Sequence, residues 1–481
     1  MDEKESQEQR PLNTRRRKRT EMEVFKEAYF PAIIACAAII LIIIFIIGSI
    51  TRSIQRGKLE TSLENEASAT AASEQELLDD EANQLASEAA ILAESYDYEG
   101  ALEKIESFSG IYTDYPILYE RHQLYTQAQS EMVTWDDPSK VLNLSFHLLI
   151  ADPQRAFQYS DTYLRQKFNE NFITVSEFQN VLQELYKNGY ILVDVDDITT
   201  GTEAKSLSLP AGKKPLILTQ TNVNYYNYMI GNDKNYIPNA NGAGFASRLI
   251  IDANGNITCE MVNAAGETVT GAYDMVPILE SFIQTHPDFS YRGARAILAV
   301  SGEEGVFGYR INHSAVTEKR LTSAQYEAEI SGAKEICAKL SALGYHIACY
   351  TYGNTGYGDK TPNDIHADMK KWSDEIATII EPMIGKIKYF VFAQNSDIAA
   401  PGVAYAGEQF DALSSYGFTH YFGFCSANKP WYHQSNTYMR QGRILVTGSA
   451  LISHPDWFAG ILDAHAVLEP SRTNVQNQET E

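Results

Sequence analysis

The sequence lacks the cysteine and histidine spacings on which most protein metal sites are built. Five cysteines and ten histidines occur in 481 residues, but no two cysteines form a C-x-x-C pair and no two histidines lie four residues apart. A nucleophile elbow of the form G-x-S-x-G is also missing. Four cysteines beyond the first apolar run allow one or two disulfides as readily as free thiols: Cys259, Cys337, Cys349 and Cys425.

Charge is missing between Ala28 and Thr51, and the centre of this segment is almost wholly isoleucine, alanine, leucine and phenylalanine. About 20 apolar residues cross a bilayer as a helix, so residues 28–51 are predicted to be a transmembrane helix. A cleavable signal peptide is the alternative. The apolar run is longer than a signal core, however, and no small-x-small cleavage site follows between Gly48 and Arg56. We therefore expect a membrane anchor.

A basic run, Arg15 to Arg19, precedes the span, and only Arg52, Arg56 and Lys58 follow it closely. The positive-inside tendency predicts that residues 1–27 form a basic cytoplasmic tail and that the C-terminal part lies outside the plasma membrane. A nuclear-localisation or nucleic-acid role for the basic run fits its position beside a span less well. Beyond the span, 31 basic and 55 acidic side chains give a net charge of about −24. Such a surface repels nucleic acid, which is therefore not an expected partner.

Helices are predicted to follow the span. Residues 52–71 are rich in Glu, Ser, Ala and Thr and are expected to form a linker or a frayed helix. Apolar residues then recur at three- and four-residue intervals from Leu77 to Ala93, and two more helices are expected within 101–132. Residues 72–134 resemble a single tetratricopeptide-like unit. Because such repeats need about three neighbours to bury their faces, a helical stalk fits the pattern as well as a peptide-binding repeat does.

Residues 135–472 show strands and helices in alternation, which predicts an α/β domain with a barrel-like or layered sheet. Asn188-Gly189 is a helix C-cap signature within it. Residues 229–270 are predicted to be an inserted β element with a hairpin between 248–252 and 257–260, and 473–481 a disordered tail. The predicted buried strands are 141–147, 190–193, 216–219, 296–300, 346–350, 389–393, 421–424 and 444–447.

Two segments of this domain resemble a known family. Residues 172–190, from Phe172-Ile173-Thr174 to Asn188-Gly189-Tyr190, resemble the opening of polysaccharide deacetylases, the NodB-homology family of carbohydrate esterases. A strand ending T-F-D-D-G follows in that family, and 218–223 takes its place here. Residues 330–354 have the shape of the family's helix followed by G-H-E-I-A-S-H-T-x-x-H. The resemblance implies a distorted (β/α) barrel with a groove that binds an N-acetylated glycan and a divalent metal, usually zinc.

The chemistry that this resemblance implies is not supported by the residues present. The family holds its metal with one aspartate and two histidines, and a second aspartate acts as general base. The base position is Thr221 here, the aspartate ligand is Asn222, and the two histidine ligands are Tyr350 and Asn354. Hydroxyl and amide oxygens replace neither carboxylate charge nor imidazole basicity at zinc. We predict a degenerate site with no metal cofactor, and expect zinc only if other ligands make the site functional.

Other residues are candidates for a retained groove. His147 and His454 lie near predicted strand ends, and Asp397 follows another strand, where capping of the next helix is the simpler interpretation. Trp431 and Tyr432 are predicted to stack on sugar faces, although core packing explains aromatic clusters more often. Asp196-Asp197 also follows a strand, but at a position that the family fills with surface acids. A shifted register would bring in other histidines: His346, His366, His420, His433 and His465.

The sequence thus predicts a single-pass plasma-membrane protein with an extracellular deacetylase-like domain. This domain is expected to bind a cell-envelope polysaccharide, with peptidoglycan as the first candidate, without hydrolysing it. One alternative is a working metal-dependent glycan N-deacetylase with a non-standard site, which stoichiometric zinc would favour. The other is a scaffold that binds a partner protein through the helical stalk, which deletion of residues 77–132 would disrupt.

Overall fold

A computed structural model describes residues 22, 25–26, 29–231, 235–425 and 429–472. Nearly all of the predicted basic tail at 1–27, and all of the predicted disordered tail at 473–481, lie outside the described residues. The chain divides into two compact units, residues 1–81 and 82–481. The second unit holds the sheet and both apolar core clusters.

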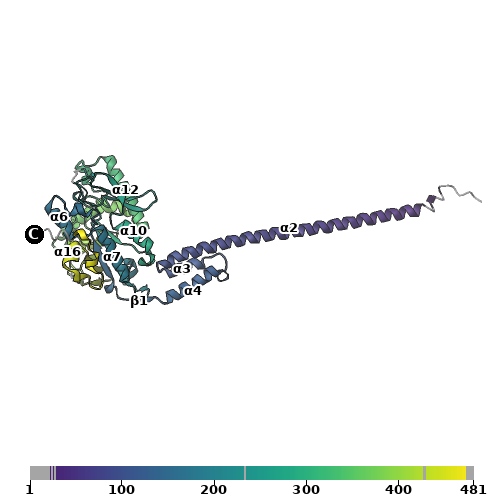
Figure 1. Cartoon of the computed structure of the whole chain (residues 1–481), viewed down its shortest axis with the longest axis horizontal. Coiled ribbons are helices and arrows are strands. Elements are labelled where there is room, and N and C mark those ends of the chain that lie inside the picture. The colour runs from purple at the N-terminus through teal and green to yellow at the C-terminus, as the bar shows by residue number, and fades with distance from the viewer. Residues whose placement is uncertain (1–21, 23–24, 27–28, 232–234, 426–428, 473–481) are drawn as a thin grey trace, which may run out of the picture. The chain divides into compact units, whose positions relative to one another are not determined.

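Helix α2 (Phe30–Glu94) is unbroken over 65 residues and is labelled in Figure 1. Residues 52–71, predicted to be a linker or a frayed helix, are therefore regular helix. This segment contains one glycine and no proline, so little in it opposes helix formation. An 18-residue window of α2 has a mean hydropathy of 3.2 and no buried residue, which is apolar enough to cross a membrane. A signal sequence shares this property, so the anchor stays a prediction.

Helices α3 (Tyr98–Glu106) and α4 (Pro116–Ser130) pack against each other (Figure 1). Lys104 of α3 forms an ion pair with Glu88 of α2 at 3.1 Å, and three alanines on one face of α2 are buried beside it: Ala82, Ala86 and Ala89. The helices predicted within 72–134 are thus present. Their assignment to a tetratricopeptide-like unit stays a prediction.

Seven parallel strands close into a barrel, in the ring order β2-β5-β9-β10-β11-β12-β14 and back to β2. The predicted α/β class and barrel are confirmed by this pairing. One predicted strand, β3 (Tyr190–Leu192), is not part of the ring. It pairs with the first half of β5, whereas β9 pairs with the second half. The ring strands are β2 (Leu142–Phe146), β5 (Lys214–Thr221), β9 (Ile297–Val300), β10 (His346–Cys349), β11 (Tyr389–Val391), β12 (His420–Phe424) and β14 (Met439–Leu445).

Alternation along the strands separates two cores. Residues such as Ile217, Ala299 and Phe422 belong to a cluster inside the barrel, whereas Leu218 and Leu298 belong to the larger cluster beneath the helices. Figure 1 shows α7, α10, α12 and α16 in this part of the molecule. The described helices of this part are α5 (Pro153–Phe157), α6 (Thr162–Asn171), α7 (Val175–Lys187), α8 (Val195–Ile198), α9 (Asn227–Ile230), α10 (Met275–Thr285), α11 (Ser314–Thr317), α12 (Ser323–Ala342), α13 (Pro362–Lys371), α14 (Thr378–Ile384), α15 (Glu408–Ser414), α16 (Gly448–Ser453) and α17 (Ala464–Val467).

Local sequence signals explain several element ends. Thr174 and Glu177 form a capping box at the start of α7, and Asn188 caps its end before Gly189, whose φ is +78°. The predicted hairpin is confirmed as β6 (Arg248–Ile251) and β7 (Ile257–Val262), which are antiparallel, and β8 (Thr268–Gly271) adds a third strand. Three short strands were not predicted: β1 (Val133–Trp135), β4 (Leu207–Leu209) and β13 (Tyr432–Gln434). Two of them, β1 and β4, pair only with each other.

Candidate functional site

The C-terminal end of the barrel is where the predicted site residues would meet, because parallel strands all end there. Strained backbone gathers at the same end. Of the twelve described non-glycine residues with positive φ, eight lie in loops that directly follow β5, β9, β10 or β11. Such strain is concentrated at functional sites in general. These residues are Asn222, Tyr225, Glu304, Phe307, Thr351, Asn354, Gln394 and Asn395.

His147 and Thr221 lie side by side at this end, one after β2 and one at the end of β5. The register pairs Phe146 with Gln220, so the next residue on each strand faces the barrel interior. The Nδ1 atom of His147 is 2.8 Å from Oγ1 of Thr221. Burial, reinforced by the Arg443 guanidinium, lowers the pKa of His147 to about 4. The imidazole is therefore neutral at neutral pH.

Asn222 is held next to this pair by a tyrosine and a serine. Its φ of +60° turns the chain sharply at the end of β5. The Tyr226 hydroxyl donates to Oδ1 of Asn222 at 3.1 Å and lies 2.7 Å from Oγ of Ser301, which follows β9. Burial raises the pKa of Tyr226 well above its usual value. Asn222, the predicted counterpart of an aspartate ligand, is thus an amide in a neutral hydrogen-bonded network.

A fully buried arginine occupies the same layer. Arg443 on β14 donates from Nη1 to Oγ of Ser145 at 3.1 Å and from Nη2 to the carbonyl oxygen of Phe392 at 2.8 Å. A side-chain hydrogen bond with Tyr350, next to the end of β10, reaches it across the barrel. Burial lowers the pKa of Arg443. Its Nε has no hydrogen-bond partner among the described residues. Asp397, which forms its ion pair with Arg440, interacts with Arg443 only electrostatically.

Asn354, the fourth replaced position, lies in the loop after β10. Its carbonyl oxygen accepts a hydrogen bond from Nε2 of Gln394 at 2.8 Å, and its own Oδ1 is buried without a partner in the described part of the chain. Thr221, Asn222, Tyr350 and Asn354 therefore lie at the ends of β5 and β10, as the resemblance implies. None of them supplies a carboxylate or an imidazole, and Arg443 adds a positive charge. This residue set does not fit a zinc ion.

Three further candidates have packing partners. Asp397 accepts from Nη2 of Arg440 at 2.8 Å and from the hydroxyl of Tyr405 at 3.1 Å, and burial raises its pKa. The indole of Trp431 donates to the carbonyl oxygen of Phe424 at 3.0 Å and covers the Arg440 guanidinium. Tyr432 packs against the cluster inside the barrel. Their part in binding a sugar stays a prediction.

His454 directly follows α16 (Gly448–Ser453), where its ring is exposed and stacks on Trp457 with centroids 4.4 Å apart. The structure shows no contact between it and the His147 network. The histidines of the shifted register are dispersed. His366 contacts Tyr416 and His433 lies against Tyr438, while His346 and His420 begin β10 and β12 at the opposite end of the barrel.

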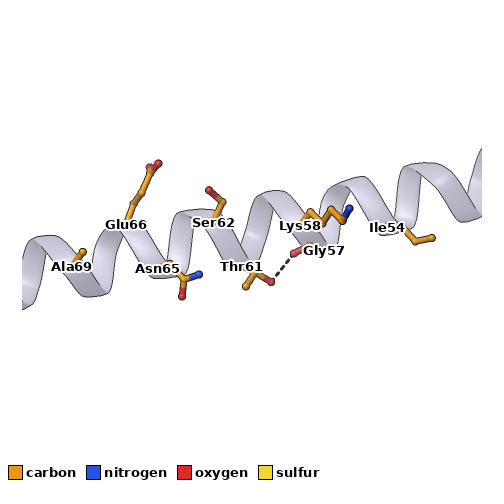
Figure 2. Close-up of a pocket in the computed structure, with 8 residues that line it drawn as sticks. All are labelled: Ile54, Gly57, Lys58, Thr61, Ser62, Asn65, Glu66 and Ala69. Atoms are coloured by element: carbon orange, nitrogen blue, oxygen red, sulfur yellow. Dashed lines mark hydrogen bonds between the residues drawn. The ribbon is translucent and has the colours of Figure 1, made fainter.

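A shallow surface on α2 is of a different kind. Its lining side chains, from Ile54 to Ala69, all project from one exposed helix (Figure 2). The hydrogen bond drawn there runs from Oγ1 of Thr61 to the carbonyl oxygen of Gly57 at 2.8 Å and stays within the helix. No titratable cluster converges on this surface, so it is not a catalytic site.

The buried thiols add no reactive group. Cys259, Cys337 and Cys349 are free and buried, and burial raises the pKa of each thiol. A buried thiol with a raised pKa is a poor nucleophile and a poor metal ligand. The sequence left disulfides and free thiols open for these three cysteines, and the structure shows free thiols.

Arg443, Ser145, Ser301 and Tyr226 were not among the predicted site residues. A signal for Arg443 existed, because Met439, Gln441 and Arg443 alternate along β14 with residues that point outward. A charged residue at an inward position of a buried strand is costly and rarely accidental. The other three are common polar residues whose positions depend on strand register.

The comparisons with known proteins place this geometry in context. No protein-family model matches the chain, and no curated protein matches it. Its structure is similar to that of the Streptococcus pyogenes deacetylase PplD in complex with acetate, with a TM-score of 0.34 and 12% identity. The match covers 66% of this chain and 98% of the other. A similarity of this size does not establish membership of a family.

Proposed function

We propose that this protein is a membrane-anchored, extracytoplasmic homologue of polysaccharide deacetylases that binds cell-envelope glycan without hydrolysing it. Support comes from the sequence resemblance, the closed seven-stranded barrel and the apolar helix that precedes it. Peptidoglycan is the proposed ligand, because an anchored domain of this type faces the wall polymer. The N-terminus lies in the cytoplasm in this proposal.

The observation that carries the loss of activity is Arg443. Its guanidinium is buried at the end of the barrel where the family holds a divalent metal, and no carboxylate among the described residues forms an ion pair with it. A fixed positive charge in a poorly solvated layer repels a divalent cation strongly. The replaced residues Thr221, Asn222 and Tyr350 add no compensating negative charge. The site therefore lacks both the ligands and the electrostatics for metal-dependent hydrolysis.

The test uses full-length protein in detergent micelles and purified insoluble peptidoglycan. We expect the protein to sediment with peptidoglycan and to release no acetate from N-acetylated glycan in the presence of zinc. Trp431→Ala and Tyr432→Ala, at the predicted sugar-stacking residues, should weaken sedimentation, whereas His366→Gln, an exposed histidine beside Tyr416, should not. Acetate release that is abolished by Asn222→Ala would show that the working-deacetylase alternative is correct.

A scaffold that binds a partner protein is the second candidate, and exposed apolar side chains in the helical segment favour it. Ile91, Ile111 and Leu124 are exposed by 67%, 66% and 61%. The serine variants of Ile111 and Leu124 should leave peptidoglycan sedimentation unchanged if the barrel alone binds glycan. The scaffold would be favoured if these variants no longer bound a defined partner protein and if neither they nor the wild type sedimented with peptidoglycan.

A further inference from the structure

The N-terminal end of the barrel, opposite the site described above, is crossed by the chain segment that follows β3. Asp194, two residues after β3, contacts Nε2 of His346 with both carboxylate oxygens, at 2.7 and 2.8 Å. Asp196 accepts from Nζ of Lys388 at 2.7 Å and from the hydroxyl of Tyr389 at 2.9 Å. His346 and Tyr389 are the first residues of β10 and β11. The segment is thus tied to the starts of adjacent strands.

Three of these side chains already have the arrangement of metal ligands. One ligand atom from each of Asp194, Asp196 and His346 lies within 4.8 Å of the others. Asp194 and His346 side chains are 23% and 22% exposed, so an ion can reach them from solvent. An acidic cluster with a histidine is common on protein surfaces, and a second observation is needed to give it meaning.

That second observation is a pair of buried atoms without partners. Oδ1 of Asp196 and Nε2 of His420 form no hydrogen bond in the described part of the chain, and they face each other at 3.6 Å. The His420 side chain is completely buried. A hydrogen on Nε2 would be too far from the carboxylate for a good bond, and a lone pair there would face a negative charge. Buried polar atoms are rarely left in this state.

The neighbours of His420 orient it as a ligand. Its Nδ1 lies 2.9 Å from Oγ1 of Thr419, which leaves Nε2 for a further partner. The ring of Tyr389 packs against both imidazoles, with centroid distances of 4.5 Å to His346 and 5.0 Å to His420. Metal-binding histidines are commonly fixed in this way through their second nitrogen.

We propose that Asp194, Asp196, His346 and His420 form a structural site for a divalent cation, with zinc as the preferred ion. Two imidazole nitrogens and two carboxylate oxygens are a donor set that suits tetrahedral zinc. The two carboxylates supply two negative charges when both histidines are neutral, and Lys388 contacts only the other oxygen of Asp196. Zinc bonds near 2.0 Å place ligand atoms about 3.3 Å apart. In the proposed site His346 therefore moves slightly away from Asp194, and His420, which lies outside the group of three close ligand atoms, moves toward that group.

The proposed ion joins the segment after β3 to the starts of β10 and β12. It lies at the end of the barrel that stabilises the fold rather than at the end where chemistry occurs in such barrels. The ion is therefore independent of the glycan site, and zinc in the purified protein would not by itself indicate a deacetylase. This separation gives the experiment its controls.

The experiment measures Co²⁺ and Zn²⁺ binding to full-length protein in detergent micelles, purified without a histidine tag and freed of metal with a chelator. Elemental analysis gives the stoichiometry, and the visible absorption of Co²⁺ reports the coordination geometry. The variants are His420→Gln and His346→Gln. The controls are His147→Gln and Asn222→Ala at the opposite end and His433→Gln, a histidine outside both groups. Near-ultraviolet circular dichroism checks that each variant is folded.

We expect a single ion per chain in the wild type and in the three controls, an intense tetrahedral Co²⁺ spectrum, and loss of the ion in both cluster variants. No bound ion in the wild type would overturn the proposal, and so would loss of the ion in His147→Gln or Asn222→Ala. If the cluster variants do not fold, the Co²⁺ absorption spectrum of the wild type tests the proposal instead. A weak spectrum typical of six-coordinate Co²⁺ would overturn the proposed site. Acetate release, measured on the same samples, tests the proposed function separately.

Discussion

Arg443 and Ser145 lie on adjacent strands inside the barrel, where Nη1 of the arginine donates to Oγ of the serine at 3.1 Å and both side chains are fully buried. The serine is neutral, so the contact satisfies a donor without balancing the charge. Tyr350 and the carbonyl oxygen of Phe392 are neutral acceptors as well. The barrel thus keeps a desolvated cation near the C-terminal ends of its strands.

This arrangement predicts that Arg443 costs stability. A buried charge without an opposite charge is often replaced by an apolar side chain with neutral or favourable effect, and functional residues are often retained at such a cost. Arg443→Met should leave the free energy of unfolding unchanged or raise it by about 1 kcal/mol, measured by urea denaturation. A loss of more than about 2 kcal/mol would mean that the guanidinium is a structural element. The matched variant is Ser145→Ala, which removes one hydrogen-bond acceptor of Arg443 and keeps the buried guanidinium.

A buried ion pair elsewhere in the barrel domain should behave in the opposite way. Nε of Arg472 lies 2.7 Å from Oε1 of Glu177, and both side chains are at most 1% exposed. Glu177→Gln leaves the arginine buried without its partner and should destabilise the protein by about 3–5 kcal/mol. Glu184→Gln breaks a pair with the exposed Lys187 and should cost less than about 0.5 kcal/mol. Equal losses in the two variants, measured by thermal or chemical unfolding, would contradict this account.

Asp274 should make stability depend on pH. The carboxylate is fully buried, and burial raises its pKa to about 6 despite hydrogen bonds from Tyr225 and Gln220. A raised carboxyl pKa means that the folded state binds more protons than the unfolded state between about pH 4 and 6, so this group's contribution to stability falls as pH rises through that range.

The measurement compares wild type with Asp274→Asn by urea denaturation at pH 4.5 and pH 7.5. Relative to wild type, the variant should gain about 2 kcal/mol of unfolding free energy between pH 4.5 and pH 7.5. Contributions from other groups cancel in the comparison, including His147 and His420, whose lowered pKa values act in the opposite direction. A pH-independent difference would show that the Asp274 pKa is ordinary.

Gly305, in the loop after β9, should tolerate no side chain. Its φ is +87°, and a Cβ atom there would lie 1.8 Å from the carbonyl oxygen of Tyr309. Gly385 has a similar φ of +80° but open space around it. Because its ψ of −177° places it in a region essentially restricted to glycine, Gly385→Ala should cost about 1–3 kcal/mol for the backbone conformation alone. Gly305→Ala should cost more than about 3 kcal/mol, because backbone must also move. Similar unfolding midpoints for the two variants would contradict this prediction.

Much of the fold follows from local sequence signals. Short apolar runs predicted each strand that forms the barrel, because strands buried on both faces need continuous apolar sequence. Asn188-Gly189 predicted the end of α7, whereas the capping box of Thr174 and Glu177 at its start was found only in the structure. The segment 52–71 was less well predicted. Its polar composition suggested a linker, whereas helix propensity without a strong breaker kept it helical.

The sequence by itself determined the apolar helix and the alternation of strands and helices, because each is a property of residue type and local spacing. The sequence also predicts, by resemblance alone, that Thr221, Asn222, Tyr350 and Asn354 are site positions. Tertiary structure decided which side chains these residues contact. Tyr350 meets Arg443 only because β10 and β14 lie on opposite sides of a closed ring, and Asp196 faces His420 only because a loop crosses the barrel end. Contacts between residues far apart in the chain depend on strand register and barrel closure, which no local pattern encodes.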